Sequence, residues 1–111
     1  LPTRAEALAH IQVLCRAYYP QFAATCPGGH MPKIAVRDMT TRWGSCSSAG
    51  NLNYNWKLVL MPERVMDYVV IHELAHRKEM NHSARFYAVV AQQMPDYKVW
   101  QSWLKEHGRE Y

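Results

Sequence analysis

Ile-His-Glu-Leu-Ala-His at residues 71–76 is the stretch that constrains the fold of this chain most strongly. Its neighbours mostly favour helix and a proline suits a first helical position, so a buried helix is predicted over Pro62–Met80. Four residues of helix turn the chain by about 400°, and therefore His72 and His76 project from one face. Histidines with this spacing can bind zinc, and Glu73 between them can act as a general base on a water molecule.

The predicted third metal ligand is His82, which lies six residues beyond His76. A continuous helix would carry His82 about 9 Å further along the axis, and one ion could not then bind both side chains. The helix must therefore end and the chain turn back, which we expect at Asn81 because asparagine tolerates left-handed backbone. The sequence thus predicts one Zn²⁺ per chain on His72, His76 and His82, with the fourth position left for water.

Three other side chains are alternative ligands. Glu79 shares a helix face with His72 but lies about 10 Å from it along the axis. Asp96 follows a proline and more simply begins the last helix. Cys46, as a fourth ligand, would close the position that catalysis needs. We favour His82 over Glu79 and Asp96 as the third ligand, and an open fourth position over Cys46.

The remaining elements follow from periodicity and from turn residues. We predict a helix over residues 3–19, strands over 33–39, 40–47 and 52–60, and C-terminal helices over 83–94 and 96–107. Thr3 and Glu6 form a capping box, Pro20 ends the first helix, and Asn81 or Ser83 caps the helix after the metal ligands. This order predicts an α+β fold: an N-terminal helix, a small three-stranded sheet, the His-Glu-x-x-His helix and C-terminal helices.

The length of 111 residues predicts a single domain over residues 1–111. The chain does not begin with methionine, which is expected of a fragment that lacks the N-terminal region of a longer chain. The formal net charge is +4 with the basic residues scattered, so nucleic acid is allowed as a partner but not indicated. No apolar stretch approaches the roughly 20 residues of a membrane span. Three cysteines without a Cys-x-x-Cys pair favour reduced thiols and a cytoplasmic location.

Several separate blocks of the sequence recur in a known family in the same order. The chain closely resembles the YgjP-like predicted metal-dependent hydrolases over roughly residues 33–107. These are zincin-type metallopeptidase domains related to the SprT and WLM groups. The blocks are Thr-Arg-Trp-Gly-Ser-Cys-Ser at 41–47, Asn-Trp-Lys-Leu at 55–58, the run 67–76, and Asn81-His82-Ser83 followed by Phe86.

The resemblance implies a zincin-like fold in which a sheet edge lies beside the metal. It also implies His72, His76 and His82 as zinc ligands and Glu73 as the catalytic carboxylate. Members of the family usually carry a longer N-terminal region, whose role here stays open. The chain departs from the otherwise similar metzincin pattern, because Glu79 stands where those enzymes have a glycine.

These residues predict a zinc-dependent hydrolase that cleaves peptide bonds in a peptide or protein substrate. The tetrahedral intermediate needs a hydrogen-bond donor, and Arg42, Tyr68 and Tyr87 are candidates, although each has an alternative structural role. An extended substrate can add as a strand beside residues 42–47 or 52–60, depending on which of them forms the sheet edge.

Two other functions stay open. One is a metal-dependent nucleotide phosphohydrolase, which the lack of a glycine-rich phosphate loop and of oxygen ligands for magnesium disfavours. The other is a nucleic-acid-binding module that zinc stabilises without catalysis. The scattered basic charge and the presence of Glu73 disfavour it.

Overall fold

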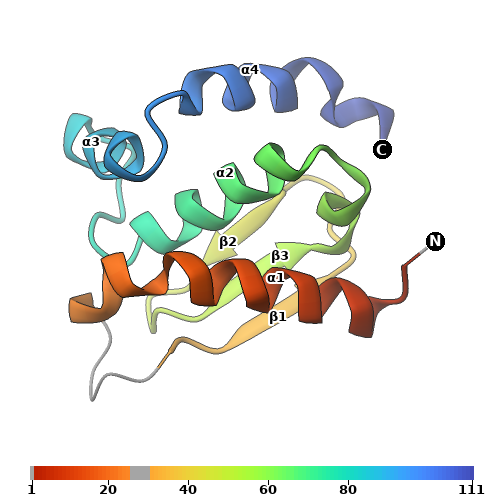
Figure 1. Cartoon of the computed structure of the whole chain (residues 1–111), viewed down its shortest axis with the longest axis horizontal. Coiled ribbons are helices and arrows are strands. Elements are labelled where there is room, and N and C mark those ends of the chain that lie inside the picture. The colour runs from red at the N-terminus through yellow and green to blue at the C-terminus, as the bar shows by residue number, and fades with distance from the viewer. Residues whose placement is uncertain (1, 26–30) are drawn as a thin grey trace.

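The computed structural model describes residues 2–25 and 31–111. Figure 1 shows its α-helices and its three strands. The elements in chain order are α1 (Arg4–Tyr18), η1 (Tyr19–Thr25), β1 (Ile34–Arg37), β2 (Gly44–Cys46), β3 (Leu52–Asn55), η3 (Trp56–Leu60), α2 (Glu63–Ala75), α3 (Ala84–Gln93), α4 (Tyr97–His107) and η4 (Gly108–Glu110). The sequence Cys-Pro-Gly-Gly-His at 26–30 predicts a loop, but these residues lie outside those that the structure describes. The α+β fold is confirmed.

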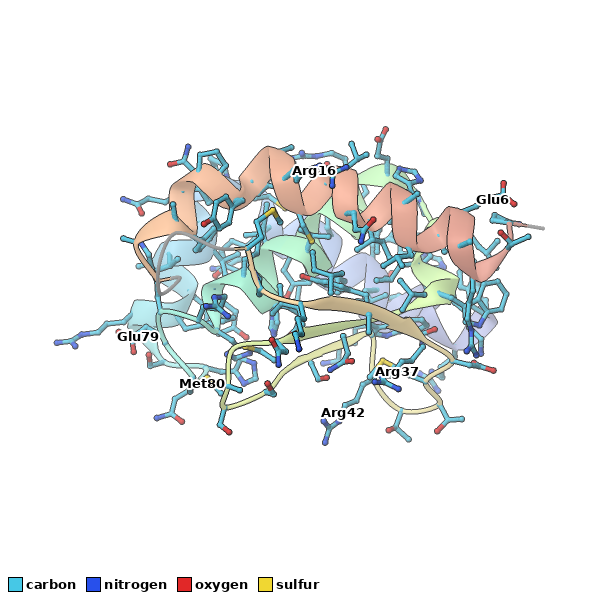
Figure 2. All side chains as sticks on the ribbon, turned by 90° about the horizontal axis from the view of Figure 1, so that it is seen from below. Glu6, Arg16, Arg37, Arg42, Glu79 and Met80 are labelled. Carbon is cyan, nitrogen blue, oxygen red and sulfur yellow. The ribbon has the colours of Figure 1, made fainter. Side chains whose placement is uncertain are left out.

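The three strands form one sheet in the order β1-β3-β2. β3 pairs in parallel with β1 and antiparallel with β2, so β3 is the central strand and β2 is an edge. β2 and β3 form a hairpin, as the turn residues Ser48-Ala49-Gly50-Asn51 predict, and the turn contains Gly50 at a positive φ of 84°. α1 packs against β1 and α2 against β2, so the two helices cover one face of the sheet (Figure 1). Arg37 and Arg42 lie on the side of the sheet away from α1 (Figure 2).

α2 is the centre of the hydrophobic core. Ten of its residues are buried, including the branched run Val69, Val70 and Ile71. Full burial of an aliphatic side chain contributes roughly 1.5–3 kcal/mol, so the helix is fixed by tertiary packing rather than by intrinsic propensity. The backbone that carries His72 and Glu73 is therefore held rigidly.

All three predicted strands are longer than the observed ones, and the strand predicted over 33–39 spans only Ile34–Arg37. The buried Asn55 accounts for the two largest differences. The predicted strand over 52–60 ends at Asn55, whose side-chain oxygen accepts a hydrogen bond from the Lys57 N–H at 3.1 Å and starts η3 instead. Its Nδ2 donates to the carbonyls of Met39 and Arg42 at 2.8 and 3.0 Å. Those bonds hold residues 39–42 out of the sheet, so the strand predicted over 40–47 begins only at Gly44.

The predicted end of the helix over residues 62–80 is also wrong, because α2 ends at Ala75 rather than Met80. Arg77 N–H bonds the Leu74 carbonyl at 3.1 Å and Lys78 N–H bonds the Ala75 carbonyl at 3.0 Å. These tighter turns replace the helical pattern directly after His76. The turn that was expected at Asn81 therefore begins about five residues earlier.

The other helix boundaries agree closely with the sequence. Thr3 and Glu6 make the predicted capping box at the start of α1. α1 ends at Tyr18, and the chain continues through Pro20 as the 3₁₀ helix η1. Ser83, not Asn81, caps α3 by accepting from the Phe86 N–H. In the described part of the chain, no helix is long and apolar enough to cross a membrane.

The core contains one thiol whose ionisation should affect stability. Cys15 is fully buried and donates to the Tyr54 hydroxyl, which itself donates to the Val70 carbonyl at 3.2 Å. Burial raises the pKa of the Cys15 thiol to about 12, whereas an exposed thiol has a pKa of about 8.5. As pH rises, the unfolded chain therefore loses this proton before the folded chain does.

We expect the free energy of unfolding to fall by about 1.4 kcal/mol per pH unit above about pH 8.5 from this thiol alone. Chemical denaturation at pH 8 and pH 10 measures the fall, and Cys15→Ala is the control that lacks the group. The fall between the two pH values should be smaller by about 2 kcal/mol in Cys15→Ala. An equal fall in both proteins would show that Cys15 is not buried as described.

Candidate metal centre

Three imidazoles converge where α2 ends. His72 lies in the last turn of α2, His76 is its C-terminal cap, and His82 returns on the segment that leads into α3. The Nε2 atom of His82 lies 3.1 Å from Nε2 of His76 and 3.2 Å from Nε2 of His72. Donor atoms of the three side chains all lie within 4.8 Å of one another.

This arrangement fits a single tetrahedral ion. Zinc–imidazole bonds of 2.0–2.1 Å at tetrahedral angles separate the donor nitrogens by about 3.3 Å. The two measured nitrogen separations, 3.1 and 3.2 Å, are close to that value. Imidazole donors in this geometry are typical of zinc, whereas magnesium and calcium prefer oxygen.

The other ring nitrogens of two histidines are hydrogen-bonded. Nδ1 of His76 lies 3.1 Å from the Glu79 carbonyl oxygen, and Nδ1 of His72 lies 3.3 Å from the Tyr68 hydroxyl. Such partners fix the ring orientation and leave Nε2 as the nitrogen that can bind a metal. The carboxylate of Glu79, which the sequence offered only as an alternative ligand, is not among the clustered donor atoms, and its backbone carbonyl contacts His76 instead.

Phe86 of α3 packs against all three imidazole rings. It is fully buried, stacks on His76 at a centroid distance of 4.4 Å, and meets His72 and His82 edge-on at 4.8 and 5.1 Å. The sequence reasoning gave Phe86 no such role. Its spacing of four residues from His82 is the signal that points to this contact.

Burial sets the charge state of the histidines. It lowers the pKa of His72 to about 3, with the neighbouring His76 and His82 as weaker causes. Burial also lowers the pKa of His76. Both rings are therefore neutral near pH 7, which is the form that binds metal ions.

Glu73 lies beside the three histidines on the buried side of the groove. Burial raises the pKa of its carboxyl to about 7, and the positive charge of Arg42 acts in the opposite direction. β2 approaches Glu73 so closely that a Cβ on Gly44 would lie 2.9 Å from Cγ of Glu73. Glycine at position 44 is thus a steric requirement that the sequence reasoning did not identify.

The groove in front of the histidines follows the edge of the sheet. A hollow of about 300 Å³ is lined by residues of β2, by His72, Glu73, His76 and His82, and by Arg42 and Met80. β3 has neighbours on both sides, so the predicted substrate contact beside residues 52–60 is not available. Among the described residues β2 pairs with β3 alone, and Gly44, Ser45 and Cys46 of β2 line this groove.

The three candidate oxyanion donors lie in different positions. Arg42 lines the groove beside Glu73 and forms no ion pair in the described residues. The Tyr68 hydroxyl is hydrogen-bonded to Nδ1 of His72. Tyr87 stacks on His82 at a centroid distance of 6.2 Å, and its hydroxyl accepts from Gln101 at 3.4 Å.

The other alternative ligands lie apart from the centre. Asp96 binds Arg64 at 3.1 Å and accepts from the Trp100 indole N–H at 3.1 Å. Cys46 lines the groove, but its thiol is not among the clustered donor atoms, and burial raises its pKa. In the residues that the structure describes, the three histidines are the set of side chains that can hold a metal ion.

Comparison with known proteins agrees with this architecture. The structure is similar to the crystal structure of the metallopeptidase zymogen of Pyrococcus abyssi abylysin, with a TM-score of 0.70 and 22% sequence identity over 86% of this chain and 93% of that chain. No curated protein matches the chain. The family model described as "YgjP-like, metallopeptidase domain" matches residues 2–107. The chain therefore belongs to the YgjP-like metallopeptidase-domain family.

Proposed function

We propose that this protein is a zinc-dependent peptidase, with His72, His76 and His82 as the zinc ligands and Glu73 as the general base. The convergence of three Nε2 atoms at separations suited to one tetrahedral ion carries the proposal. Membership of a metallopeptidase-domain family supports the same reaction class.

His72, His76 and His82 would hold the zinc ion, which would supply Lewis acidity for activating water and polarising the scissile carbonyl. The Glu73 carboxylate then accepts a proton from the attacking water and delivers it to the leaving amine. Its burial between α2 and Gly44 keeps it oriented toward the groove. The free edge of β2 supplies backbone groups that can pair with an extended substrate. Arg42 is the best placed of the candidate oxyanion donors, because it lines the groove next to Glu73.

The histidine triad and Glu73 favour this function over the alternatives. A structural zinc site is usually closed by four protein ligands, whereas only three side chains cluster here within the described residues. A purely structural site also needs no buried carboxylate such as Glu73 beside its ligands.

Metal content tests the ligand set. The purified protein should bind about one zinc per chain, and His82→Ala should lose at least tenfold in zinc affinity because the ion then keeps two protein ligands. Competition with a chromophoric chelator measures the affinity. His10→Ala, at an exposed position on α1, is the control and should bind zinc normally. Unchanged affinity in His82→Ala would remove His82 from the ligand set.

Glu73→Gln tests the general base. The amide cannot accept the proton, so hydrolysis of a cleavable peptide should fall by about 10²–10⁴-fold. The zinc affinity should stay within about threefold of the parent protein, because Glu73 is not a ligand. Single-turnover cleavage and elemental analysis measure the two quantities separately. Full turnover with Glu73→Gln would contradict the assignment.

Tyr68→Phe tests whether the Tyr68 hydroxyl orients His72. Loss of a hydrogen-bond partner behind a metal ligand typically lowers metal affinity by about 10–100-fold. We expect an effect at the lower end, about tenfold, in chelator competition. Tyr87→Phe removes the same group from the ring that stacks on His82 and should leave the affinity unchanged. Equal affinities in the two variants would make Tyr68 a packing residue only.

A further inference from the structure

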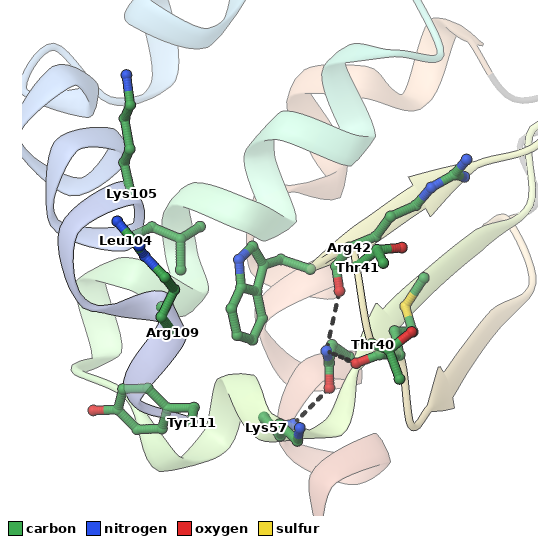
Figure 3. A pocket seen from close by; sticks show the side chains of 12 residues that line it. Thr40, Thr41, Arg42, Lys57, Leu104, Lys105, Arg109 and Tyr111 are labelled. Carbon is green, nitrogen blue, oxygen red and sulfur yellow. Dashed lines mark hydrogen bonds between the residues drawn. The ribbon is translucent and has the colours of Figure 1, made fainter.

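A second hollow adjoins the groove that contains His72, Glu73, His76 and His82, which we call the metal groove. Four basic side chains line this second hollow. It has a volume of about 410 Å³ and is lined by Arg42, Lys57, Lys105 and Arg109, which we call the basic hollow. Figure 3 shows Arg109 and Tyr111 on the α4 and η4 side, and on the other side Lys57 of η3 and Thr40 of the segment between β1 and β2. No Asp or Glu side chain is among its lining residues.

The four cations of the basic hollow have no close carboxylate partner within the described residues. Arg64 shows the contrast, because it binds both Asp67 and Asp96. Like charges around one hollow repel each other, and an anion bound among them relieves that repulsion.

Close contacts fix the backbone on both sides of the basic hollow. Asn55 is buried and bonds the carbonyls of Met39 and Arg42, which fixes the loop on one side (Figure 3). On the other side Gly108 packs against the Trp43 indole so tightly that a Cβ there would lie 2.9 Å from the ring. The backbone segments that carry Arg42 and Arg109 are therefore held in place.

The basic hollow shares lining residues with the hollows that contain the histidines and Glu73. Trp43 and Leu104 line both the basic hollow and a neighbouring hollow that contains His72 and Glu73. Arg42 lines these two and also the hollow that holds the three histidines. An extended peptide covers about 3.3 Å per residue, so a substrate at Glu73 reaches the basic hollow within a few residues.

The direction of β2 decides which part of a substrate lies there. Arg42 and Trp43 directly precede β2, so the basic hollow lies at the N-terminal end of this strand. Antiparallel pairs outnumber parallel ones roughly two- to three-fold in sheets. A substrate that pairs antiparallel with β2 runs, in its own C-terminal direction, toward the basic hollow.

We infer that the basic hollow is a substrate subsite that binds a carboxylate on the C-terminal side of the scissile bond. The carboxylate belongs either to an acidic side chain or to the end of the peptide. Lys57 and Arg109, which flank the hollow, supply the binding charge. This inference rests on the proposed peptidase function for its orientation, but not for the binding of an anion.

Binding to zinc-loaded Glu73→Gln tests the subsite without cleavage. The probes are fluorescein-labelled hexapeptides in which one position after another carries glutamate or its neutral analogue glutamine, each with a free or an amidated C-terminus. For one position of the carboxylate, the glutamate or free-acid peptide should bind at least tenfold more tightly than the matching glutamine or amidated peptide. A preference for internal glutamate assigns a side-chain carboxylate, and a preference for the free acid assigns the terminal one.

The charge variants must remove this preference selectively. Lys57→Gln and Arg109→Gln, introduced together into the Glu73→Gln protein, should abolish the tenfold difference in peptide affinity while the zinc content stays the same. Arg4→Gln with Lys98→Gln removes the same number of charges from exposed positions outside the basic hollow and should preserve it. Loss of the difference in both pairs of variants would assign it to overall charge and overturn the inference.

Two further results separate this inference from the proposed function. Cleavage of the preferred peptide by the Glu73-containing protein identifies the scissile bond, and a carboxylate on its N-terminal side would overturn the inferred orientation. Charge-dependent binding without cleavage would keep the anion subsite and contradict the peptidase. Inorganic triphosphate that displaces every peptide and binds more tightly than all of them would overturn the carboxylate assignment.

Discussion

The early end of α2 is the constraint on which the whole site depends. If the helix continued past His76, His82 would be carried away from the other two histidines. Instead the Arg77 and Lys78 N–H groups bond carbonyls three residues back, and the chain turns at once. Arg77 also donates to the Gly50 carbonyl, which ties the turn to the β2–β3 hairpin. The sheet and the third imidazole are thus positioned by the same few residues.

Burial around this turn prepares the donor atoms for metal binding. The rings of His72 and His76 are held neutral because desolvation lowers their pKa values. Phe86 packs beneath all three rings, and the Tyr68 hydroxyl and the Glu79 carbonyl engage the nitrogens that face away from the cluster. Rigid support of this kind is what keeps a catalytic constellation within its productive geometry.

Much of this architecture could be predicted from the sequence, because local rules governed it. Helical spacing placed His72 and His76 on one face, and the capping residues Thr3 and Ser83 marked helix starts. The predicted element bounds were wrong where one side chain bonds residues that are distant in the sequence. Asn55 ends a strand and detaches a loop through bonds to residues up to 16 positions away, which no periodicity reveals. The parallel pairing of β1 with β3 and the contact of Gly44 with Glu73 are likewise tertiary.

The central claim is that one ion sits among three Nε2 atoms while Glu73 stays uncoordinated. Anomalous diffraction at the zinc absorption edge, from crystals of the zinc-loaded protein, tests it most directly. The account predicts one strong peak within about 2.0–2.1 Å of Nε2 of His72, His76 and His82. A peak that excludes His82, or that includes the Glu73 carboxylate as a ligand, would contradict it.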